Sequence, residues 1–247
     1  MWTPESLLII GLTFLIAGLV KGVIGLGLPT VSLALLTATL GLKPAMALLL
    51  LPSFVTNVWQ GMAGKEFLSI ARRLWTLLVA VCVGTWLGVH VLANSDTALL
   101  SALLGVLLGV YSTLNLVQPR VPSFGKSEIW LSPMIGGING VLTGMTGSFV
   151  VPGVLYLQAL ALPRDALIQA MGILFTISTV ALAVSLSDHR LLSMELGALS
   201  TVAIIPALIG MVVGQKVRQR LSETAFRKIF FISLLLLGVY IVLRSIF

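Results

Sequence analysis

The sequence predicts an all-α polytopic membrane protein built from two inverted repeats of five segments each. Three observations predict this fold class: a very apolar composition, two short apolar segments that each follow a glycine-rich break, and an uneven distribution of basic residues. Hydrophobic residues make up 58% of the 247 residues, charged residues make up 9%, and the mean hydropathy is +1.11. A soluble domain carries about 25% charged residues, so this chain is expected to reside in a membrane.

Ten apolar segments follow one another along the chain, and residues 1–247 are predicted to form a single transmembrane domain. The segments lie near residues 6–24, 29–41, 45–63, 74–93, 97–117, 129–147, 150–161, 166–186, 196–214 and 229–247, and eight of them are long enough to cross a bilayer. The segments 29–41 and 150–161 have about a dozen residues each, which gives about 18 Å of helix where a span needs about 30 Å.

The chain carries signs of an internal duplication. Each short segment directly follows a glycine-rich stretch, GVIGLGLP in the first half and GVLTGMTGSFVVP in the second. A shift of 119 positions aligns residues of the two halves: Gly18 with Gly137, Gly25 with Gly144, Pro44 with Pro163, Ser53 with Gly172, Asn57 with Thr176 and Gln60 with Thr179. We therefore predict repeat 1 at residues 1–122 and repeat 2 at 123–247, each beginning with a Gly/Pro-broken helical hairpin that has a short second arm.

Basic residues predict the orientation of the segments. If the loop 64–73 is cytoplasmic, eleven of the fifteen Lys and Arg residues lie inside: Lys65, Arg72, Arg73, Arg120, Lys126, Arg164, Lys216, Arg218, Arg220, Arg227 and Lys228. Lys43, Arg190, Arg244 and both termini then lie outside. The first hairpin would open from the outside and the second from the cytoplasm, so the halves have opposite orientations, as in many secondary transporters.

Several classes of function find no support in the composition. The net charge of +7 is explained by cytoplasmic loops, so no nucleic-acid partner is expected. A single cysteine, Cys82, excludes a disulfide framework, and His90 and His189 are too far apart in sequence to suggest a metal site. No motif of an enzyme lies at membrane depth. The start, MWTPESLLII, has no basic n-region and carries Glu5, so no cleaved signal peptide is predicted.

The two glycine-rich breaks predict a binding site. Non-helical backbone survives within the hydrocarbon only against protein or a water-filled cavity. Gly25, Gly27 and Pro29 are expected to mark the start of one half-helix, and Gly147 and Pro152 the start of the other. The N-terminus of a half-helix presents unpaired N–H groups and favours anions. The two termini are expected to converge near the centre of the bilayer.

Glycine has an alternative role, since GxxxG pairs let helices pack closely. Such pairs occur at Gly18/Gly22, Gly84/Gly88, Gly105/Gly109, Gly140/Gly144 and Gly210/Gly214. We expect close packing to explain the glycines of the unbroken segments and a binding site to explain the two breaks.

Lys21 and a polar stripe add to the candidate site. Lys21 lies about 15 residues into an apolar run, where a lone ammonium costs at least a few kcal/mol. It either snorkels to an interface or pairs with a bound anion, and a role in carrying protons is also open. The segment 45–63 carries Ser53, Thr56, Asn57 and Gln60 on one helical face, and Gln169, Gly172, Thr176 and Thr179 form a thinner version. These stripes either bond neighbouring helices or line a cavity. The predicted substrate-binding residues are Lys21, Gly25, Gly27, Thr30, Ser53, Asn57, Gln60, Asn139, Thr143, Thr146, Gly147, Ser148, Gln169 and Thr176.

The stretches GLVKGVIGLGLPTVSLALL and GVLTGMTGSFVVPGVLYLQALALPRDALIQA resemble the paired motifs of the TauE/SafE family of membrane transporters. The resemblance covers nearly the whole chain, including the spacing from each glycine motif to the KPA or PRDA turn. It implies transport of sulfite, sulfonates such as sulfoacetate, or related organic anions across the prokaryotic inner (plasma) membrane by a multi-pass protein. Ser148 and Phe149 stand where the family pattern has further glycine, which leaves the substrate open.

The expected function is therefore that of a secondary transporter that exports a small anion by alternating access, with the substrate held between the two hairpin tips. An anion channel, a membrane enzyme and a non-transporting membrane subunit are the alternatives. No resident cofactor or metal is expected. All eight acidic residues lie in loops or near segment ends, which argues against a buried carboxylate relay and leaves H⁺ coupling, Na⁺ coupling and uniport open. The expected partners are the anion and the lipid bilayer, and a homodimer is an open alternative.

Overall fold

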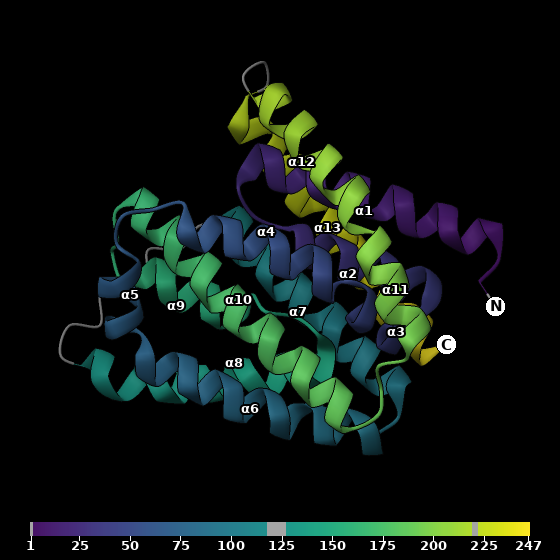
Figure 1. Cartoon of the computed structure of the whole chain (residues 1–247), viewed down its shortest axis with the longest axis horizontal. Coiled ribbons are helices and arrows are strands. Elements are labelled where there is room, and N and C mark those ends of the chain that lie inside the picture. Colours follow the sequence, from purple (N-terminus) through teal and green to yellow (C-terminus); the bar gives the residue numbers. More distant parts are fainter. Residues whose placement is uncertain (1, 118–126, 219–221) are drawn as a thin grey trace. The chain divides into compact units, whose positions relative to one another are not determined.

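The computed structural model describes residues 2–117, 127–218 and 222–247, and every regular element in these residues is a helix (Figure 1). The elements are α1 (Pro4–Ile24), α2 (Leu28–Leu40), α3 (Leu42–Leu48), α4 (Leu50–Met62), α5 (Phe67–Arg73), α6 (Trp75–Asn94), α7 (Thr97–Val117), α8 (Glu128–Thr146), α9 (Gly153–Ala159), α10 (Arg164–Asp188), α11 (Met194–Val202), α12 (Ile204–Arg218) and α13 (Glu223–Ile246). The predicted positions of Arg120, Lys126 and Arg220, and the repeat boundary at residue 122, lie outside the described residues.

The helices confirm the predicted all-helical, polytopic membrane fold, with three differences. The segment 45–63 forms two helices, α3 and α4, bent by 44°. The loop 64–73 contains α5, which the sequence did not predict. Among the described residues, six helical spans are long and apolar enough to cross a membrane when α11 and α12 are counted as one, or seven if α3 and α4 also form one span, where the sequence predicted eight segments of sufficient length. The helix α8 is long enough, but its glycines and polar residues lower its hydropathy.

The chain divides into two compact units, and each unit combines segments from both halves of the sequence. Unit 1 contains Met1–Pro52, Asp96–Gln118 and Ser193–Phe247, and unit 2 contains Ser53–Ser95 and Pro119–Leu192. The first broken hairpin, α1 and α2, belongs to unit 1, whereas the second, α8 and α9, belongs to unit 2. The predicted duplication and the inversion of its halves stay predictions.

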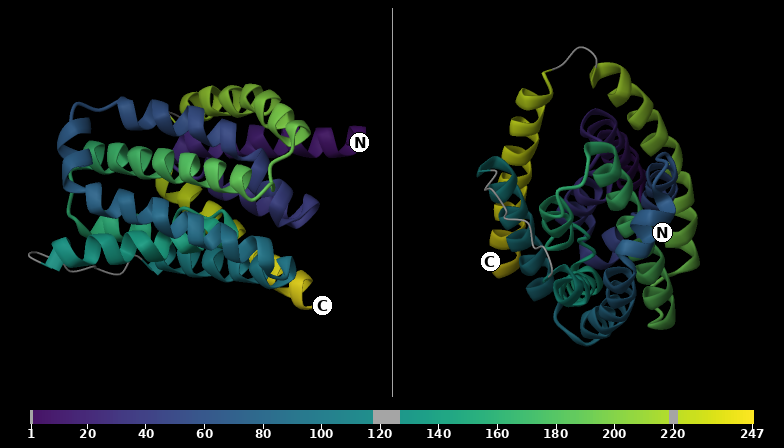
Figure 2. Two further views of the ribbon diagram at one scale, coloured as in Figure 1. Left: turned by 60° about the horizontal axis from the view of Figure 1, so that its bottom comes forward. Right: turned by 90° about the vertical axis from the view of Figure 1, so that its left-hand side faces the viewer.

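In unit 1, α1 packs in parallel against α12, which lies nearly a whole chain away in the sequence (Figures 1 and 2). Gly18 and Gly22 face the backbone of Ala207 and Met211, and a Cβ on either glycine would collide with a carbonyl oxygen of α12. Gly210 and Gly214 face α1 in the same way. The helices α7 and α13 also pack together, but they run antiparallel, because Gly105 lies beside Gly238 while Gly109 lies beside Leu235.

In unit 2, α6 packs in parallel against α8. Gly140 and Gly144 of α8 face the backbone of Val81 and Thr85, and Gly84 and Gly88 of α6 face Gly137 and Val141. The predicted use of GxxxG pairs for close helix packing is therefore confirmed for the pairs in these two crossings.

The two parallel crossings repeat the same pattern of contacts. In each, two glycines of a broken hairpin's first arm meet two glycines of the fourth segment of the other half. Gly25 and Gly147 each end the first arm, three residues after the second glycine of the pair. Gly25 therefore corresponds to Gly147, and Lys21 corresponds to Thr143. This correspondence differs by three positions from the shift of 119 positions that aligned the two halves of the sequence.

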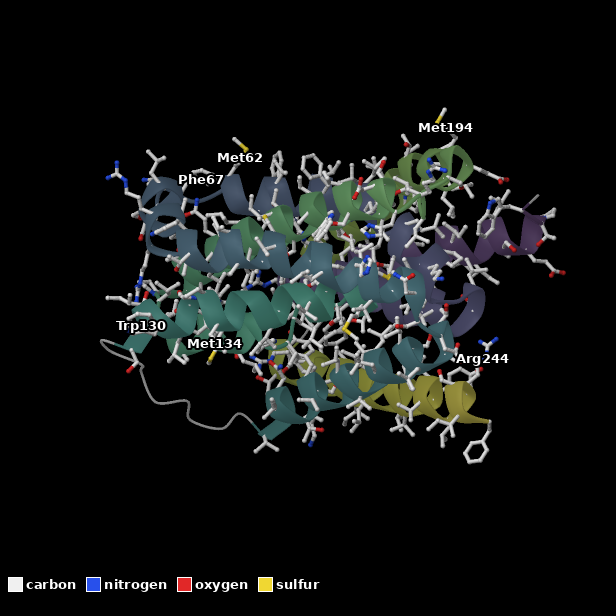
Figure 3. The ribbon with its side chains drawn as sticks, turned by 90° about the horizontal axis from the view of Figure 1, so that it is seen from below. Met62, Phe67, Trp130, Met134, Met194 and Arg244 are labelled. Carbon is white, nitrogen blue, oxygen red and sulfur yellow. The ribbon has the colours of Figure 1, made fainter. Side chains whose placement is uncertain are left out.

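The exposed side chains of both units are mainly large and apolar, as expected of surfaces that face acyl chains. In unit 2, Met62, Trp130 and Met134 point outward, and the side chain of Trp130 is 81% exposed (Figure 3). In unit 1, Met194 is almost fully exposed at the start of α11. These surfaces fit the assignment of the chain to a membrane.

Candidate functional site

The first break lies between α1 and α2 and is formed by glycine. Gly25 and Gly27 have φ angles of +83° and +104°, in the left-handed region that other residues rarely adopt. The N–H of Gly25 donates to the carbonyl of Lys21 at 2.8 Å and ends α1. Pro29 occupies the first turn of α2, where its missing N–H costs nothing. The break predicted from Gly25, Gly27 and Pro29 is therefore confirmed.

The N-terminus of α2 has no side-chain cap. Its N-cap residue is Gly27, which has no side chain to accept a hydrogen bond from the first turn. The surroundings are apolar, since Gly27 lies close to the side chains of Val20, Val31 and Phe230. The positive end of the α2 dipole is therefore poorly screened, and it favours a negatively charged group. Thr30, in the same first turn, is buried.

Lys21 lies in the last turn of α1, one turn before the break. Its ammonium is favourably placed for the negative end of the α1 dipole. The residue is only 5% exposed, so its side chain does not extend to the outer surface of the protein, which disfavours the snorkelling alternative. The first break therefore combines a buried lysine with an uncapped helix N-terminus.

The second break, between α8 and α9, uses the same turn but different side chains. Gly147 has a φ angle of +75°, and its N–H donates to the carbonyl of Thr143 at 2.7 Å. The hydroxyl of Thr143 donates to the carbonyl of Ser148 at 3.0 Å, and that of Thr146 donates to the carbonyl of Leu142 at 2.6 Å. The backbone N–H of Ser148 donates to the Thr146 hydroxyl. The two threonines therefore hold the turn.

Asn139 fastens the start of α9. Its Oδ1 accepts a hydrogen bond from the N–H of Gly153 at 2.9 Å, so this N–H is not bare, contrary to the expectation for the second half-helix. The helix α9 is also shorter than predicted, with seven residues. Because an N–H needs an acceptor, the remaining amide atom of Asn139 is Nδ2, a donor.

Two donors at the second break have no acceptor in the described part of the chain. Asn139 Nδ2 and Ser148 Oγ are both buried and make no hydrogen bond. Each such group costs about 1–3 kcal/mol when it stays unsatisfied. An acceptor oxygen brought by a ligand would remove this cost, so the second break is suited to an oxygen-rich anion.

The glutamines of the two polar stripes bond to backbone groups between helices of unit 2. Gln60 Nε2 donates to the carbonyl of Ile168 at 2.9 Å, which ties α4 to α10. Gln169 Nε2 donates to the carbonyl of Gly61, and its Oε1 accepts from the N–H of Glu66. These contacts favour the helix-bonding alternative for both glutamines.

The remaining predicted site residues of the two stripes are Ser53 and Asn57 of α4 and Thr176 of α10. Ser53 and Asn57 are fully buried in α4, and the Ser53 hydroxyl has no partner among the described residues. Thr176 donates to the carbonyl of Gly172 within α10. It borders an apolar cavity of about 430 Å³ that includes Val58 and Ile173. The structure thus gathers Asn139, Thr143, Thr146, Gly147 and Ser148 around one turn, while Lys21, Gly25, Gly27 and Thr30 form the turn of unit 1.

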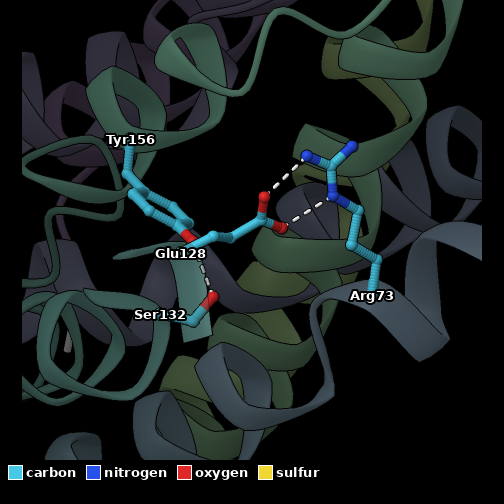
Figure 4. A network of polar contacts seen from close by, with 4 residues as sticks. All are labelled: Arg73, Glu128, Ser132 and Tyr156. Carbon is cyan, nitrogen blue, oxygen red and sulfur yellow. Dashed lines mark hydrogen bonds and ion pairs between the residues drawn. The ribbon is translucent and has the colours of Figure 1, made fainter. Parts of the chain in front are cut away.

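Sequence reasoning missed two polar contacts near the start of α8. Arg73 binds Glu128 through two hydrogen bonds of 2.7 Å, and Ser132 bonds to Tyr156 of α9 at 2.7 Å (Figure 4). The hydrogen bond to Glu128 raises the pKa of Arg73 above its usual value. The only sequence signal was the spacing of Glu128 and Ser132 by one helical turn. These contacts fasten both arms of the hairpin to each other and to α5.

The two histidines also meet in unit 2, which their separation in the sequence did not suggest. The rings of His90 and His189 lie 5.7 Å apart, and Trp86 donates to Asp188 at 3.3 Å beside them. Among the described residues, no group of three His, Cys, Asp or Glu side chains is placed to hold a metal ion.

Comparison with known proteins adds the family. The family model described as Sulfite exporter TauE/SafE matches residues 10–241, a range that includes both glycine-rich breaks and all or most of every long helix. No curated protein and no solved structure matches the chain. Because the family match spans nearly the whole sequence, the chain belongs to the sulfite exporter TauE/SafE family of membrane transporters.

Proposed function

We propose that this chain is a secondary transporter that exports a small anion across the prokaryotic inner membrane by alternating access. The candidate anions are sulfite, a sulfonate such as sulfoacetate, or a related organic anion. Membership of the sulfite exporter family supports transport of an anion. The chemistry of the two breaks supports the choice of anions with several acceptor oxygens.

One observation carries the proposal: Asn139 Nδ2 and Ser148 Oγ are buried donors without acceptors, at a turn where a half-length helix begins. Sulfite and sulfonate groups present three oxygens that accept hydrogen bonds. Neutral donors bind such groups without a fixed opposite charge, which favours reversible binding. The substrate is therefore assigned to the donors of the second break.

The first break has a positive character that suits the same class of anion. Lys21 is buried, and the uncapped N-terminus of α2 adds a partial positive charge in apolar surroundings. We assign Lys21 to charge neutralisation and the backbone N–H groups of α2 to hydrogen bonding of the anion. The meeting of the two tips stays a prediction from the sequence.

The proposal is tested by comparing two buried serines in proteoliposomes loaded with sulfite. Ser148 and Ser178 both lie in unit 2, and both have hydroxyls without partners in the described residues, but Ser178 lies within α10, away from any break in the chain. Both Ser148→Ala and Ser178→Ala remove an unsatisfied group, so neither is expected to destabilise the fold. Only Ser148→Ala is expected to weaken transport, with KM raised about 10-fold for the loss of a hydrogen bond to a charged group.

Equal transport by the two variants would remove the second break from the substrate site. Currents far above transporter turnover in a planar bilayer recording would show that the protein is an anion channel and not a transporter. Absence of any thermal shift with sulfite, sulfonates or carboxylates would favour a non-transporting membrane subunit. Measuring transport in the same liposomes with either an H⁺ or a Na⁺ gradient identifies which ion, if either, is coupled to transport.

A further inference from the structure

A second polar cavity lies in unit 1, apart from the broken hairpin. It has a volume of about 700 Å³ and lies between the end of α7 and the start of α13. Asn115, Thr224, Arg227 and Lys228 give it a polar side, whereas Phe231 and Ile232 give it an apolar side. A cavity of this size holds far more than a small inorganic anion. Its mixed lining suits a molecule with a polar head and an apolar tail.

The charge of the cavity is positive. Arg227 and Lys228 are consecutive residues of α13, and both line it. No acidic side chain lines the cavity within the described residues, and no carboxylate there pairs with either cation. Two cations without carboxylate partners among the described side chains favour an anionic occupant.

An aromatic wall positions the guanidinium of Arg227. The group lies 5.9 Å from the centre of the Phe231 ring, and the Phe231 ring meets Tyr111 edge-on at 5.5 Å. A guanidinium that lies over a ring face keeps its N–H edges available for a phosphate, which they bind in a bidentate manner. The Phe231 ring therefore lies beside the guanidinium of Arg227 where both residues line the cavity.

The depth of the cavity matches that of lipid head groups. The apolar spans of α7 and α13 are Thr97–Val117 and Thr224–Ile246, so the cavity lies where one span ends and the other begins. Lys216 and Arg218, at the end of α12, add basic residues at the same end of unit 1 as Arg227 and Lys228. Clusters of basic residues mark the cytoplasmic face, where anionic lipids are concentrated.

We infer that this cavity binds an anionic phospholipid of the cytoplasmic leaflet. The phosphodiester lies between Arg227 and Lys228, Asn115 and Thr224 contact the polar part of the head group, and an acyl chain follows Phe231 and Ile232. The inference does not depend on the proposed anion transport. A free anion from the cytoplasm shares the phosphate chemistry, but it would leave the apolar side of the cavity empty.

The test uses the purified full-length protein after delipidation. Native mass spectrometry and thermal unfolding are followed while phosphatidylglycerol, phosphatidylcholine or inorganic phosphate is added. The double variant Arg227→Gln with Lys228→Gln is compared with Lys216→Gln with Arg218→Gln, which removes the same charge at the same end of unit 1. The wild type and the control are expected to bind phosphatidylglycerol equally, and the cavity variant about 30-fold more weakly.

Three results would overturn the inference: equal lipid binding by both double variants, equal binding of phosphatidylglycerol and phosphatidylcholine, or equal protection by inorganic phosphate. The last result would assign the cavity to a soluble anion. If the double variant does not fold, Arg227→Lys takes its place. It keeps the charge but loses the planar fork, so its affinity for phosphatidylglycerol should fall several-fold while its stability without lipid is unchanged.

Discussion

At the scale of single residues, the two breaks share a turn but differ in chemistry. Lys21 and Thr143 occupy corresponding positions, since each offers its carbonyl to the left-handed glycine four residues later. The first break therefore carries a charge, and the second carries neutral groups. The buried donors Asn139 Nδ2 and Ser148 Oγ make no hydrogen bond within the described residues.

Replacing Lys21 by Met is expected to reduce anion transport about 10- to 100-fold, because a hydrogen bond to a charged group contributes about 1.5–3 kcal/mol. The fold should persist, since methionine fills a similar volume and removes a buried charge. The measurement is sulfite flux in proteoliposomes, together with the midpoint of thermal unfolding. Lys43→Met is the control because it removes the same charge at the start of α3. Unchanged flux in the Lys21 variant would exclude this residue from the site.

Gln169→Ala is expected to act on stability rather than on substrate affinity. It leaves the carbonyl of Gly61 and the N–H of Glu66 without their partner, which should cost about 2 kcal/mol. The unfolding midpoint in detergent should fall, while KM for the anion stays the same. Gln215→Ala, at an exposed position on α12, should change neither quantity. A raised KM with unchanged stability would instead restore Gln169 to the substrate site.

At the scale of the elements, each broken hairpin is held by a helix from the other half of the sequence. The contact of α1 with α12 and that of α8 with α6 use glycine on both sides, so backbone touches backbone. Among the described residues, neither short second arm makes a glycine-to-backbone contact of this kind with a helix of the other half. The arm α9 is instead fastened by side chains, through Asn139 and through the Ser132–Tyr156 hydrogen bond. The second hairpin thus combines a closely packed first arm with a second arm bonded by side chains.

Two neighbouring glycines of α8 offer a matched test of this packing. A Cβ at Gly140 would collide with the carbonyl of Val81, whereas one at Gly137 would meet no atom within 4 Å. Gly140→Ala should therefore destabilise the protein by about 3 kcal/mol through overpacking. Gly137→Ala should be neutral or stabilise α8 by up to about 1 kcal/mol. Thermal unfolding of the purified variants measures both effects, and equal midpoints would show that the crossing is looser than described.

At the scale of the whole molecule, the positive-inside rule can be tested within unit 1. The start of α3 and the end of α12 lie at opposite ends of this unit (Figures 1 and 2). Lys43 belongs to the first end and Lys216 to the second. The rule places the basic end of α12 in the cytoplasm.

Cysteine labelling checks this orientation. In a Cys82→Ala background, Lys43→Cys should react with a membrane-impermeant maleimide in intact cells. Lys216→Cys should react only after the cells are permeabilised. Labelling in the reverse order would invert the assigned topology, and labelling of both positions in intact cells would contradict their placement on opposite faces.

Most of the helices could be predicted from the sequence because their signals are local. Long apolar runs determine the spans, and the closeness of Gly25, Gly27 and Pro29 in sequence determines a turn that needs no distant partner. The bend between α3 and α4 and the helix α5 were not predicted, since neither has a strong local signal in a chain that is apolar almost throughout.

By itself, the sequence determined the membrane class, the two breaks and the family, because each of these depends on short stretches of residues. Only the tertiary structure decided which glycine pair meets which, that Gln60 and Gln169 bond α4 to α10, and that Asn139 satisfies one donor while keeping another. Only the tertiary structure also showed that Asn115 and Arg227 line the same cavity. The physical reason is that a hydrogen bond or a close backbone contact depends on distance in space, whereas a residue pattern carries only distance along the chain.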